Sequence, residues 1–204
     1  MGKLIEVGKL IKAPVPLEVA HEVIQSLNLI GTLVIAGGAA RDTILGRVPK
    51  DFDLVVIQGS AECERVEELL EHAVNVIRRK LPEATDIEQY PTYRDIQGHI
   101  AYVVKFSYKG FDFDVIEYME YMESPEEQCE YFDTTLNMAY FTYETSESDR
   151  LVPVAHPRFI QTLRTGKVEV LDSIDNDVDK RLKYLQSKYP EFEYPFINLE
   201  LPLV

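Results

Sequence analysis

Basic residues, cysteines and long apolar runs are scarce in this chain, and each shortage argues against a class of protein. Two cysteines, Cys63 and Cys129, are too few for a disulfide framework or a zinc site, so we expect two reduced thiols in a cytoplasmic protein. No run of about 18 apolar residues is present. Residues 1–16 also lack the apolar core of a signal peptide, so we expect no contact with a membrane.

The shortage of basic residues bears on the partners that we expect. The chain has 21 lysines and arginines against 35 aspartates and glutamates, which gives a formal net charge of −14. Nucleic-acid-binding proteins usually carry a basic surface, because neutralising phosphates supplies most of their affinity. The acidic total argues against a protein that grips a long duplex, although a local basic groove remains compatible with it. It suits a site in which carboxylates hold Mg²⁺.

The pattern of apolar residues predicts alternating helices and strands. The expected helices are 16–30, 40–46, 60–81, 156–166 and 173–190. The expected strands are 32–36 and 51–57, followed by a β-hairpin over 100–119 and by a helical turn that runs into a strand over 130–144. We place the hairpin turn at Lys109-Gly110. This alternation predicts an α/β or α+β protein.

Two aspartates on the expected strand 51–57 suggest a metal site. Alternate residues of a strand share a face, so Asp51 and Asp53 point the same way. Neighbouring carboxylates repel one another unless a positive charge lies between them. Oxygen ligands select Mg²⁺ or Mn²⁺. Taken alone, the pair could equally lie on a solvated strand edge.

The second strand of the expected hairpin offers a third carboxylate. Asp112 and Asp114 share one face there, and a two-metal site needs one acid from a neighbouring strand. We favour Asp114, because apolar residues follow it along the strand. Asp112 lies nearer the turn, and a solvated position is the alternative for it.

Gly37 and Gly38 stand between an expected strand and an expected helix. Glycines there let backbone N–H groups approach an anion, and the start of the helix favours phosphate. Arg41 follows in the first helical turn, where it could contact the same phosphates or lie on the surface. The spacing fits neither the dinucleotide-binding fingerprint nor the P-loop.

The stretch "GGAARDTILGRVPKDFDLVV" (37–56) resembles the signature of class II nucleotidyltransferases of the DNA polymerase β superfamily, the CCA-adding tRNA nucleotidyltransferases and bacterial poly(A) polymerases. The resemblance implies a polymerase β-like nucleotidyltransferase fold, with a mixed, mainly antiparallel sheet flanked by helices and a short C-terminal helical neck. It implies that Asp51 and Asp53 bind catalytic Mg²⁺ or Mn²⁺. It further implies that Gly37 and Gly38 hold the triphosphate, with Arg41 and Asp42 beside it.

A second stretch, "YFDTTLNMAY" (131–140), is similar to the family motif that helps to hold the incoming nucleotide. Asp133, Thr135 and Asn137 match that motif. Its two arginines are replaced by Tyr131 and Phe132, which cannot donate to phosphate as arginine does, so we expect different nucleotide contacts. Tyr131 could stack on a base or ribose, or simply pack.

A third stretch, "DNDVDKRLKY" (175–184), resembles the family's base-reading motif. Asp177 stands at helical spacing from Lys180 and Arg181 and could form, with either of them, an edge that pairs with a base. A solvent-facing helix with an i, i+4 salt bridge is the alternative. Residues 180–188 also form the densest basic cluster of the chain. We expect RNA, if it binds, to contact that segment.

The resemblance spans about residues 30–185 and predicts a nucleotidyltransferase head at 1–150 with a partial helical neck and tail at 151–204. The implied reaction moves a nucleoside monophosphate from an NTP such as ATP to an acceptor hydroxyl and releases pyrophosphate. The closeness of the first motif favours an RNA 3′ end, as in tRNA processing. The family's tRNA-gripping domains have no room here, so a protein or small-molecule acceptor is the alternative. A non-catalytic nucleotide-binding remnant is a third possibility.

Overall fold

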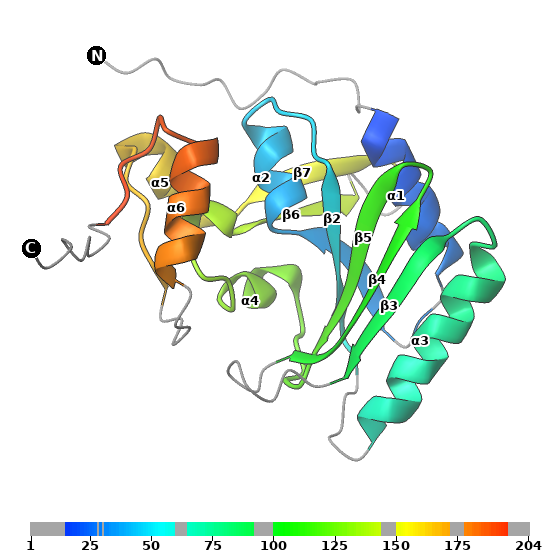
Figure 1. Ribbon diagram of the computed structural model, residues 1–204. Coiled ribbons are helices and arrows are strands. Elements are labelled where there is room, and N and C mark those ends of the chain that lie inside the picture. Colours follow the sequence, from blue (N-terminus) through cyan, green and yellow to red (C-terminus); the bar gives the residue numbers. More distant parts are fainter. Residues whose placement is uncertain are drawn as a thin grey trace, which may run out of the picture.

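The computed structural model describes residues 15–27, 29, 31–59, 65–91, 100–143, 150–171 and 178–195, which fold around a seven-stranded sheet (Figure 1). The strands follow the order β3-β4-β5-β2-β1-β6-β7. They are β1 (Thr32–Ala36), β2 (Asp51–Ile57), β3 (Thr85–Pro91), β4 (Ile100–Tyr108), β5 (Phe111–Tyr118), β6 (Ala139–Tyr143) and β7 (Leu151–Ala155). Strands β2 and β5 pair in parallel, and the other neighbours pair antiparallel. The predicted mixed, mainly antiparallel sheet is therefore confirmed.

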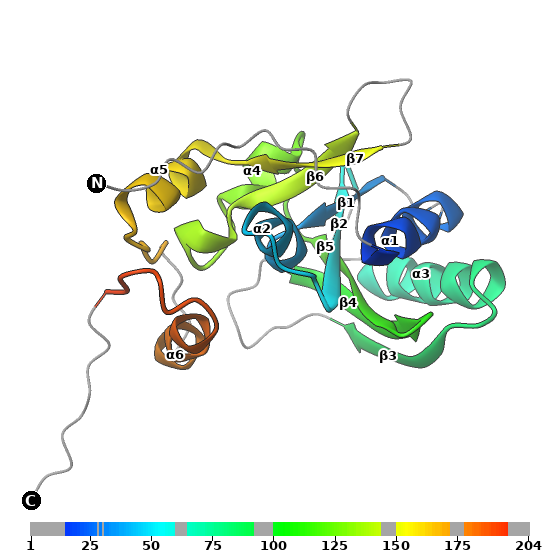
Figure 2. The same cartoon turned by 90° about the horizontal axis from the view of Figure 1, so that it is seen from above.

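Helices flank this sheet, as predicted. They are α1 (Val15–Ser26), α2 (Gly38–Ile44), α3 (Val66–Lys80), α4 (Pro125–Cys129), α5 (Pro157–Thr165) and α6 (Val178–Lys188), with a 3₁₀ turn η2 (Thr135–Asn137). In both views α5 and α6 lie on the left and α1 and α3 on the right (Figures 1 and 2). Helix α3 contacts β3 and β4, whereas α2 contacts β2, β6 and β7. Helix α2 thus lies between β2 and helices α5 and α6 (Figure 1).

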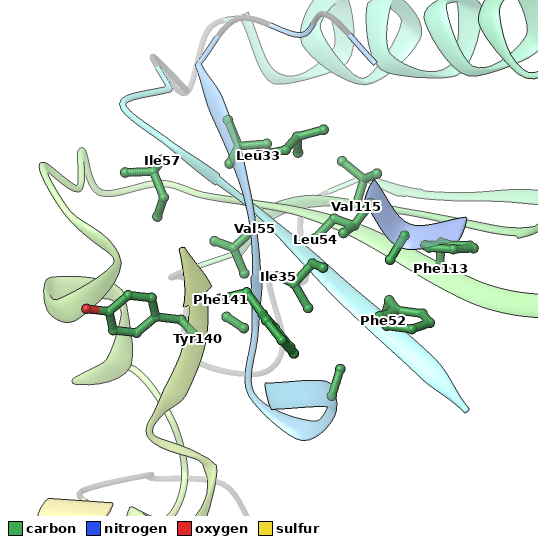
Figure 3. Close-up of a cluster of buried hydrophobic side chains, with 14 of the residues drawn as sticks. Leu33, Ile35, Phe52, Leu54, Val55, Ile57, Phe113, Val115, Tyr140 and Phe141 are labelled. Atoms are coloured by element: carbon green, nitrogen blue, oxygen red, sulfur yellow. The ribbon is translucent and has the colours of Figure 1, made fainter. Parts of the chain in front are cut away.

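The core forms because the central strands present alternating apolar side chains to one side. Phe52 and Leu54 of β2 are fully buried, as is Phe113 of β5 (Figure 3). The Phe52 and Phe113 rings stack with their centroids 5.3 Å apart, and Phe106 of β4 stacks on Phe113 at the same distance. Burying aromatic side chains of this size is a large favourable contribution to folding. Because Phe52 of β2 pairs with Phe113 of β5 on this side of the sheet, the aspartates on either side of each phenylalanine lie on the opposite side.

Three elements were not predicted from the sequence. Strand β3 is mostly exposed, so it lacks the apolar alternation that marks a strand. Strand β7 contains Pro153, which an edge strand tolerates because its free side needs no N–H donor. Helix α4 has only five residues, and the Ser124 side chain caps it by accepting from the Glu127 N–H.

The boundaries of other elements also differ from the sequence-based expectation. Helix α1 ends at Ser26, not at residue 30. Helix α3 is described from Val66, and residues 60–64 of the expected helix lie outside the described residues. The hairpin turn at Lys109-Gly110 is confirmed, with positive φ at both residues. Strand β7 lies beyond the expected boundary at residue 150 yet pairs with β6 in the same sheet. The division into head and neck remains a prediction.

Two expectations concern cysteine and the membrane. Cys129 is a buried free thiol, and burial raises its pKa to about 12. Cys63 lies outside the described residues. Within the described ranges, none of the helices has the length and apolar character needed to cross a membrane.

Candidate active site

Two aspartates on β2 lie beside two on β5 in the same register. Asp51 is opposite Asp112, and Asp53 is opposite Asp114. The intervening Phe52 is buried on the other side of the sheet, so the four aspartates share one face, as the alternation predicts. A parallel pair of strands has therefore brought together residues that are about 60 positions apart in the sequence.

Asp53 is the electrostatic centre of this face. Burial raises the pKa of Asp53 to about 7, and the carboxylates of Asp114 and Asp51 contribute to the rise in that order. The positive charges of Arg181 and Lys105 act against it. A carboxyl whose pKa is raised to near neutral pH by burial and by neighbouring carboxylates is typical of a functional site. The three aspartates that the sequence predicts as a group are thus electrostatically coupled.

The two candidates for the third carboxylate have different partners. Asp114 is partly exposed and accepts from the Lys105 Nζ of β4 at 2.8 Å. Asp112 is exposed and accepts from the Ser107 Oγ at 2.7 Å. Asp114 lies opposite Asp53 and is the largest carboxylate contribution to its raised pKa. This geometry favours Asp114 over Asp112.

The donor set suits a hard divalent cation. Asp51, Asp53 and Asp114 offer only carboxylate oxygens, and their mutual repulsion is what a cation between them would relieve. Across the part of the chain that the structure describes, no three acidic, histidine or cysteine side chains already form a set of metal ligands. One member of the predicted set, Asp114, is instead paired with Lys105. Ligation by the three aspartates remains a prediction.

The Gly37-Gly38 turn lies directly beside Asp53. Gly37 has φ 66°, and its N–H donates to the Ala139 carbonyl at 2.7 Å. A Cβ on Gly37 would lie 3.3 Å from the Phe132 ring and 3.5 Å from Asp53 Oδ2. The positive φ favours glycine, and the Phe132 ring leaves little room for a Cβ. The predicted triphosphate turn and the predicted metal ligand are therefore neighbours.

Arg41 is buried, with 2% of its surface exposed. Its Nε donates to the Tyr189 hydroxyl at 2.8 Å, and its Nη1 donates to the Asn137 Oδ1. The guanidinium carbon lies 4.5 Å from the centroid of the Tyr189 ring, which adds a cation–π contact. The surface alternative for Arg41 is wrong. Contact with phosphate remains a prediction.

Asp42 is also buried, and it joins α2 to the end of α6. It accepts from the Tyr189 hydroxyl and from the Lys188 Nζ at 3.1 Å, and it lies 3.3 Å from Arg41 Nε. Burial and the hydrogen bond to Asp42 raise the pKa of Tyr189. The predicted nucleotide contact of Asp42 remains untested, but its contacts here hold the C-terminal helix in place.

Asn137 and Asp133 link this network to Arg181. The Asn137 Nδ2 donates to Asp133 Oδ1 at 2.6 Å, and the Arg181 Nε donates to Asp133 Oδ2 at 2.9 Å. Four residues predicted from three separate motifs thus form one chain: Arg41, Asn137, Asp133 and Arg181. Asp177, the predicted partner of Arg181 in base reading, lies outside the described residues.

Aromatic residues occupy the positions where the related motif has two arginines. Phe132 packs over the Gly37 turn. Tyr131 is 37% exposed, and its ring lies 5.7 Å from that of Tyr118. Burial raises the pKa of Tyr118 to about 12, with a further contribution from Asp53. An aromatic pair therefore lies close to the carboxylates, and Phe132 has a packing role.

Two important residues were missed by sequence reasoning. Lys105 is the one charged residue in the β4 sequence "IAYVVKFSY". A charge inside an otherwise mostly apolar strand is a signal that could have indicated a functional role for it. Tyr189 follows α6 and is fully buried, yet nothing in the local pattern distinguishes it from the other tyrosines. It joins Arg41 and Asp42 only in the folded chain.

A protein-family model described as "Gabija anti-defense 2 family protein" matches residues 18–166. The matched span includes β1 to β7 with the Gly37 turn and all four aspartates. Among curated protein sequences, none is similar to this chain.

Solved structures with a similar fold include tRNA-processing enzymes. A Thermotoga maritima CCA-adding enzyme complexed with tRNA has a TM-score of 0.58 and 16% identity, over 90% of this chain and 40% of that one. A structure titled "tRNA-processing enzyme (apo form I)" has a TM-score of 0.57 and 21% identity, over 91% and 45%. A CCA-adding enzyme with ATP has a TM-score of 0.57 and 16% identity, over 89% and 40%. This chain therefore has a nucleotidyltransferase-like fold and spans less than half the length of these structures.

Proposed function

The chain belongs to the Gabija anti-defense 2 family, and we propose that it is a metal-dependent nucleotidyltransferase that moves a nucleoside monophosphate from an NTP to an acceptor hydroxyl. The observation that carries the proposal is the register of β2 and β5, which places Asp53 opposite Asp114. Both aspartates lie on the face of the sheet opposite the buried Phe52 and Phe113. The Gly37 turn lies against the same Asp53. A carboxylate cluster beside a glycine turn is what a metal-bound triphosphate requires. As a member of an anti-defense family, the chain would use this reaction against a defence system.

The residues of the site would divide the work as follows. Asp51, Asp53 and Asp114 would hold Mg²⁺ or Mn²⁺, which when bound lowers the pKa of the acceptor hydroxyl and neutralises charge on the leaving pyrophosphate. Gly37 and Gly38 would let backbone N–H groups approach the triphosphate. Catalysis of this kind rests on positioning and charge stabilisation, so the protein needs no nucleophile of its own.

An RNA 3′ end is the first candidate acceptor. The similar structures include complexes with tRNA and with ATP, and α6 presents exposed cations at Lys180, Arg181 and Lys183. A protein hydroxyl is the second candidate. Two observations favour it: Lys188 and Arg181 are already engaged with Asp42 and Asp133, and the chain is acidic as a whole.

The test uses the full chain with Mg²⁺ and each NTP in turn, labelled on the α-phosphate. Total RNA and total protein serve as separate acceptor pools. We expect label in one pool with the wild-type chain and with Asp112→Asn, and none with Asp51→Asn. Asp112 is the matched control because it lies opposite Asp51 and outside the proposed ligand set. No label in either pool with any NTP would contradict the proposal.

Metal binding should depend on pH through Asp53. A carboxylate must be ionised to bind a cation, and the pKa of Asp53 is raised to about 7. Mn²⁺ affinity is therefore expected to rise about tenfold between pH 6 and pH 8 and to level off above that range. Isothermal titration calorimetry with Mn²⁺ checks this. A pH-independent affinity, or the same pH profile in Asp53→Asn, would rule out Asp53 as the titrating ligand.

A further inference from the structure

Lys105 places a positive charge against the candidate metal ligands. It stands on β4 opposite Asp114 of β5, and Asp114 stands opposite Asp53 of β2. The Lys105 Nζ lies 2.8 Å from Asp114 Oδ2 and 6.0 Å from the centroid of the Tyr90 ring. The three charged residues thus form one row across three neighbouring strands, in the order carboxylate, carboxylate, ammonium.

This ammonium acts on two of the carboxylates, Asp114 and Asp53. Lys105 is among the positive charges that oppose the raised pKa of Asp53, which lies one strand beyond its ion-pair partner. Without a divalent ion, Arg181 and Lys105 are the cations that oppose the crowding of carboxylates around Asp53, and Lys105 is the one paired directly with Asp114. The same contact occupies an oxygen of Asp114 that a divalent ion would need.

We propose that Lys105 is a built-in competitor of the divalent ion at Asp114, so that the free protein binds the ion weakly and Asp114 joins the ligand set only when the ion displaces the lysine. This inference rests on the proposed function, because it takes Asp51, Asp53 and Asp114 as the ligands. Lys105 is a positioning residue: it acts through Asp114. An ion that arrives together with an NTP brings the additional ligands that make displacement favourable. The lysine therefore couples metal binding at this face to the presence of the nucleotide.

A purely structural ion pair would have different consequences. Lys105 and Asp114 have side chains 42% and 28% exposed, and exposed pairs contribute little to stability. Removing such a pair would leave metal affinity unchanged. Removing a competitor would raise it, because the repulsion between the ammonium and the incoming cation is lost. Metal affinity is therefore the readout that separates the two roles.

The experiment titrates the metal-free full chain with Mn²⁺ at pH 8 and measures free Mn²⁺ by electron paramagnetic resonance. Lys105→Met and Lys105→Gln are expected to bind Mn²⁺ about tenfold more tightly than the wild-type chain. Lys105→Arg keeps the charge and should bind as the wild type does. Lys109→Met is the matched control, because Lys109 lies in the same hairpin and pairs with Glu22 at 2.7 Å. Thermal unfolding of each variant confirms that it is folded.

The possible results separate this inference from the proposed function. Unchanged or weaker Mn²⁺ binding in folded Lys105→Met and Lys105→Gln would overturn the inference. If Mn²⁺ binds and Asp51→Asn abolishes binding while the lysine variants show no gain, the proposed ligand set stands and only the inference fails. Mn²⁺ binding that Asp51→Asn leaves intact would contradict the ligand set itself. Binding that is detected only in the lysine variants would support the inference most strongly.

Discussion

Replacing Asp53 with asparagine is expected to abolish nucleotidyl transfer and, at the same time, to stabilise the fold. The carboxylates of Asp114 and Asp51 both raise the pKa of Asp53, and Asp53 lies next to the Gly37 turn. An amide cannot supply the negative charge that a divalent cation needs. Losing several kcal/mol of transition-state stabilisation corresponds to a rate reduced by at least about 10³-fold.

The gain in stability follows from the raised pKa of Asp53. That pKa is about 7 in the folded chain, against an ordinary value of 3.8. Well below the ordinary pKa of 3.8, the carboxyl is protonated in both the folded and the unfolded chain and costs nothing. As the pH rises towards 7, the unfolded chain ionises freely while the folded chain must do so against burial and its neighbours, so stability falls. Asp53→Asn removes this cost and is expected to add about 2–4 kcal/mol at pH 8, or roughly 5–10 °C in Tm.

Thermal unfolding without metal at pH 5 and pH 8 measures this gain. The advantage of Asp53→Asn over the wild-type chain should be larger at pH 8 than at pH 5. Asp112→Asn is the control, since Asp112 is exposed and bonded to Ser107, and it should show little effect at either pH. An Asp53→Asn variant that is destabilised at pH 8, or that retains transfer, would contradict the role given to Asp53.

Replacing Asp42 with alanine is expected to have the opposite effect on stability. Asp42 is buried and carries the countercharge for Arg41 and Lys188 as well as a hydrogen bond from Tyr189. Removing one member of a buried charged network leaves the others uncompensated, which typically costs about 3–5 kcal/mol. We therefore expect the Tm to fall by roughly 10 °C.

Denaturant unfolding of Asp42→Ala checks this estimate, and Glu191→Ala is its control. Glu191 pairs with Arg47 at 2.8 Å beside the same network, but both side chains are more than a third exposed. Losing that exposed pair should cost less than about 1 kcal/mol. A cost for Asp42→Ala no larger than that of its control would show that the buried network does not hold α6 to α2.

These contacts show that the stretch from Gly37 to Asp42 also has a structural role. Its glycines lie beside the carboxylates, whereas Arg41 and Asp42 point into a network with Tyr189. That network continues through Asn137 to Asp133, which holds Arg181. The residues that resemble a nucleotide-binding motif therefore also determine where α6 lies. We therefore expect substitutions at the buried members, Arg41 and Asp42, to affect both the fold and the arrangement of the site.

The shared face of Asp51 and Asp53 could be predicted from the sequence, because strand alternation is a local property. The hairpin turn at Lys109-Gly110 could be predicted for the same reason, since glycine tolerates the positive φ that the turn needs. Strand β3 could not, because its side chains are mostly exposed and it forms by pairing with β4. Pairing with β4 makes this segment a strand, and such long-range pairing is not visible in the local sequence pattern.

The partners of the site residues were the part that sequence reasoning could not supply. Which of Asp112 and Asp114 faces Asp53 depends on the register of two strands that are far apart in the chain. The ion pair of Lys105 and the burial of Tyr189 depend on the same long-range packing. Motif similarity pointed to Asp51 and Asp53, but only the fold shows that Lys105 lies against Asp114 beside them.

The most direct test of the central claim compares the fate of two labels on the same NTP. The full chain is incubated with Mg²⁺, the acceptor pool that accepts label, and NTP labelled on either the α- or the γ-phosphate. If Asp51, Asp53 and Asp114 support nucleotidyl transfer, the α-label is covalently attached to the acceptor and the γ-label leaves in pyrophosphate. Attachment of the γ-label, or of neither label, would contradict the account.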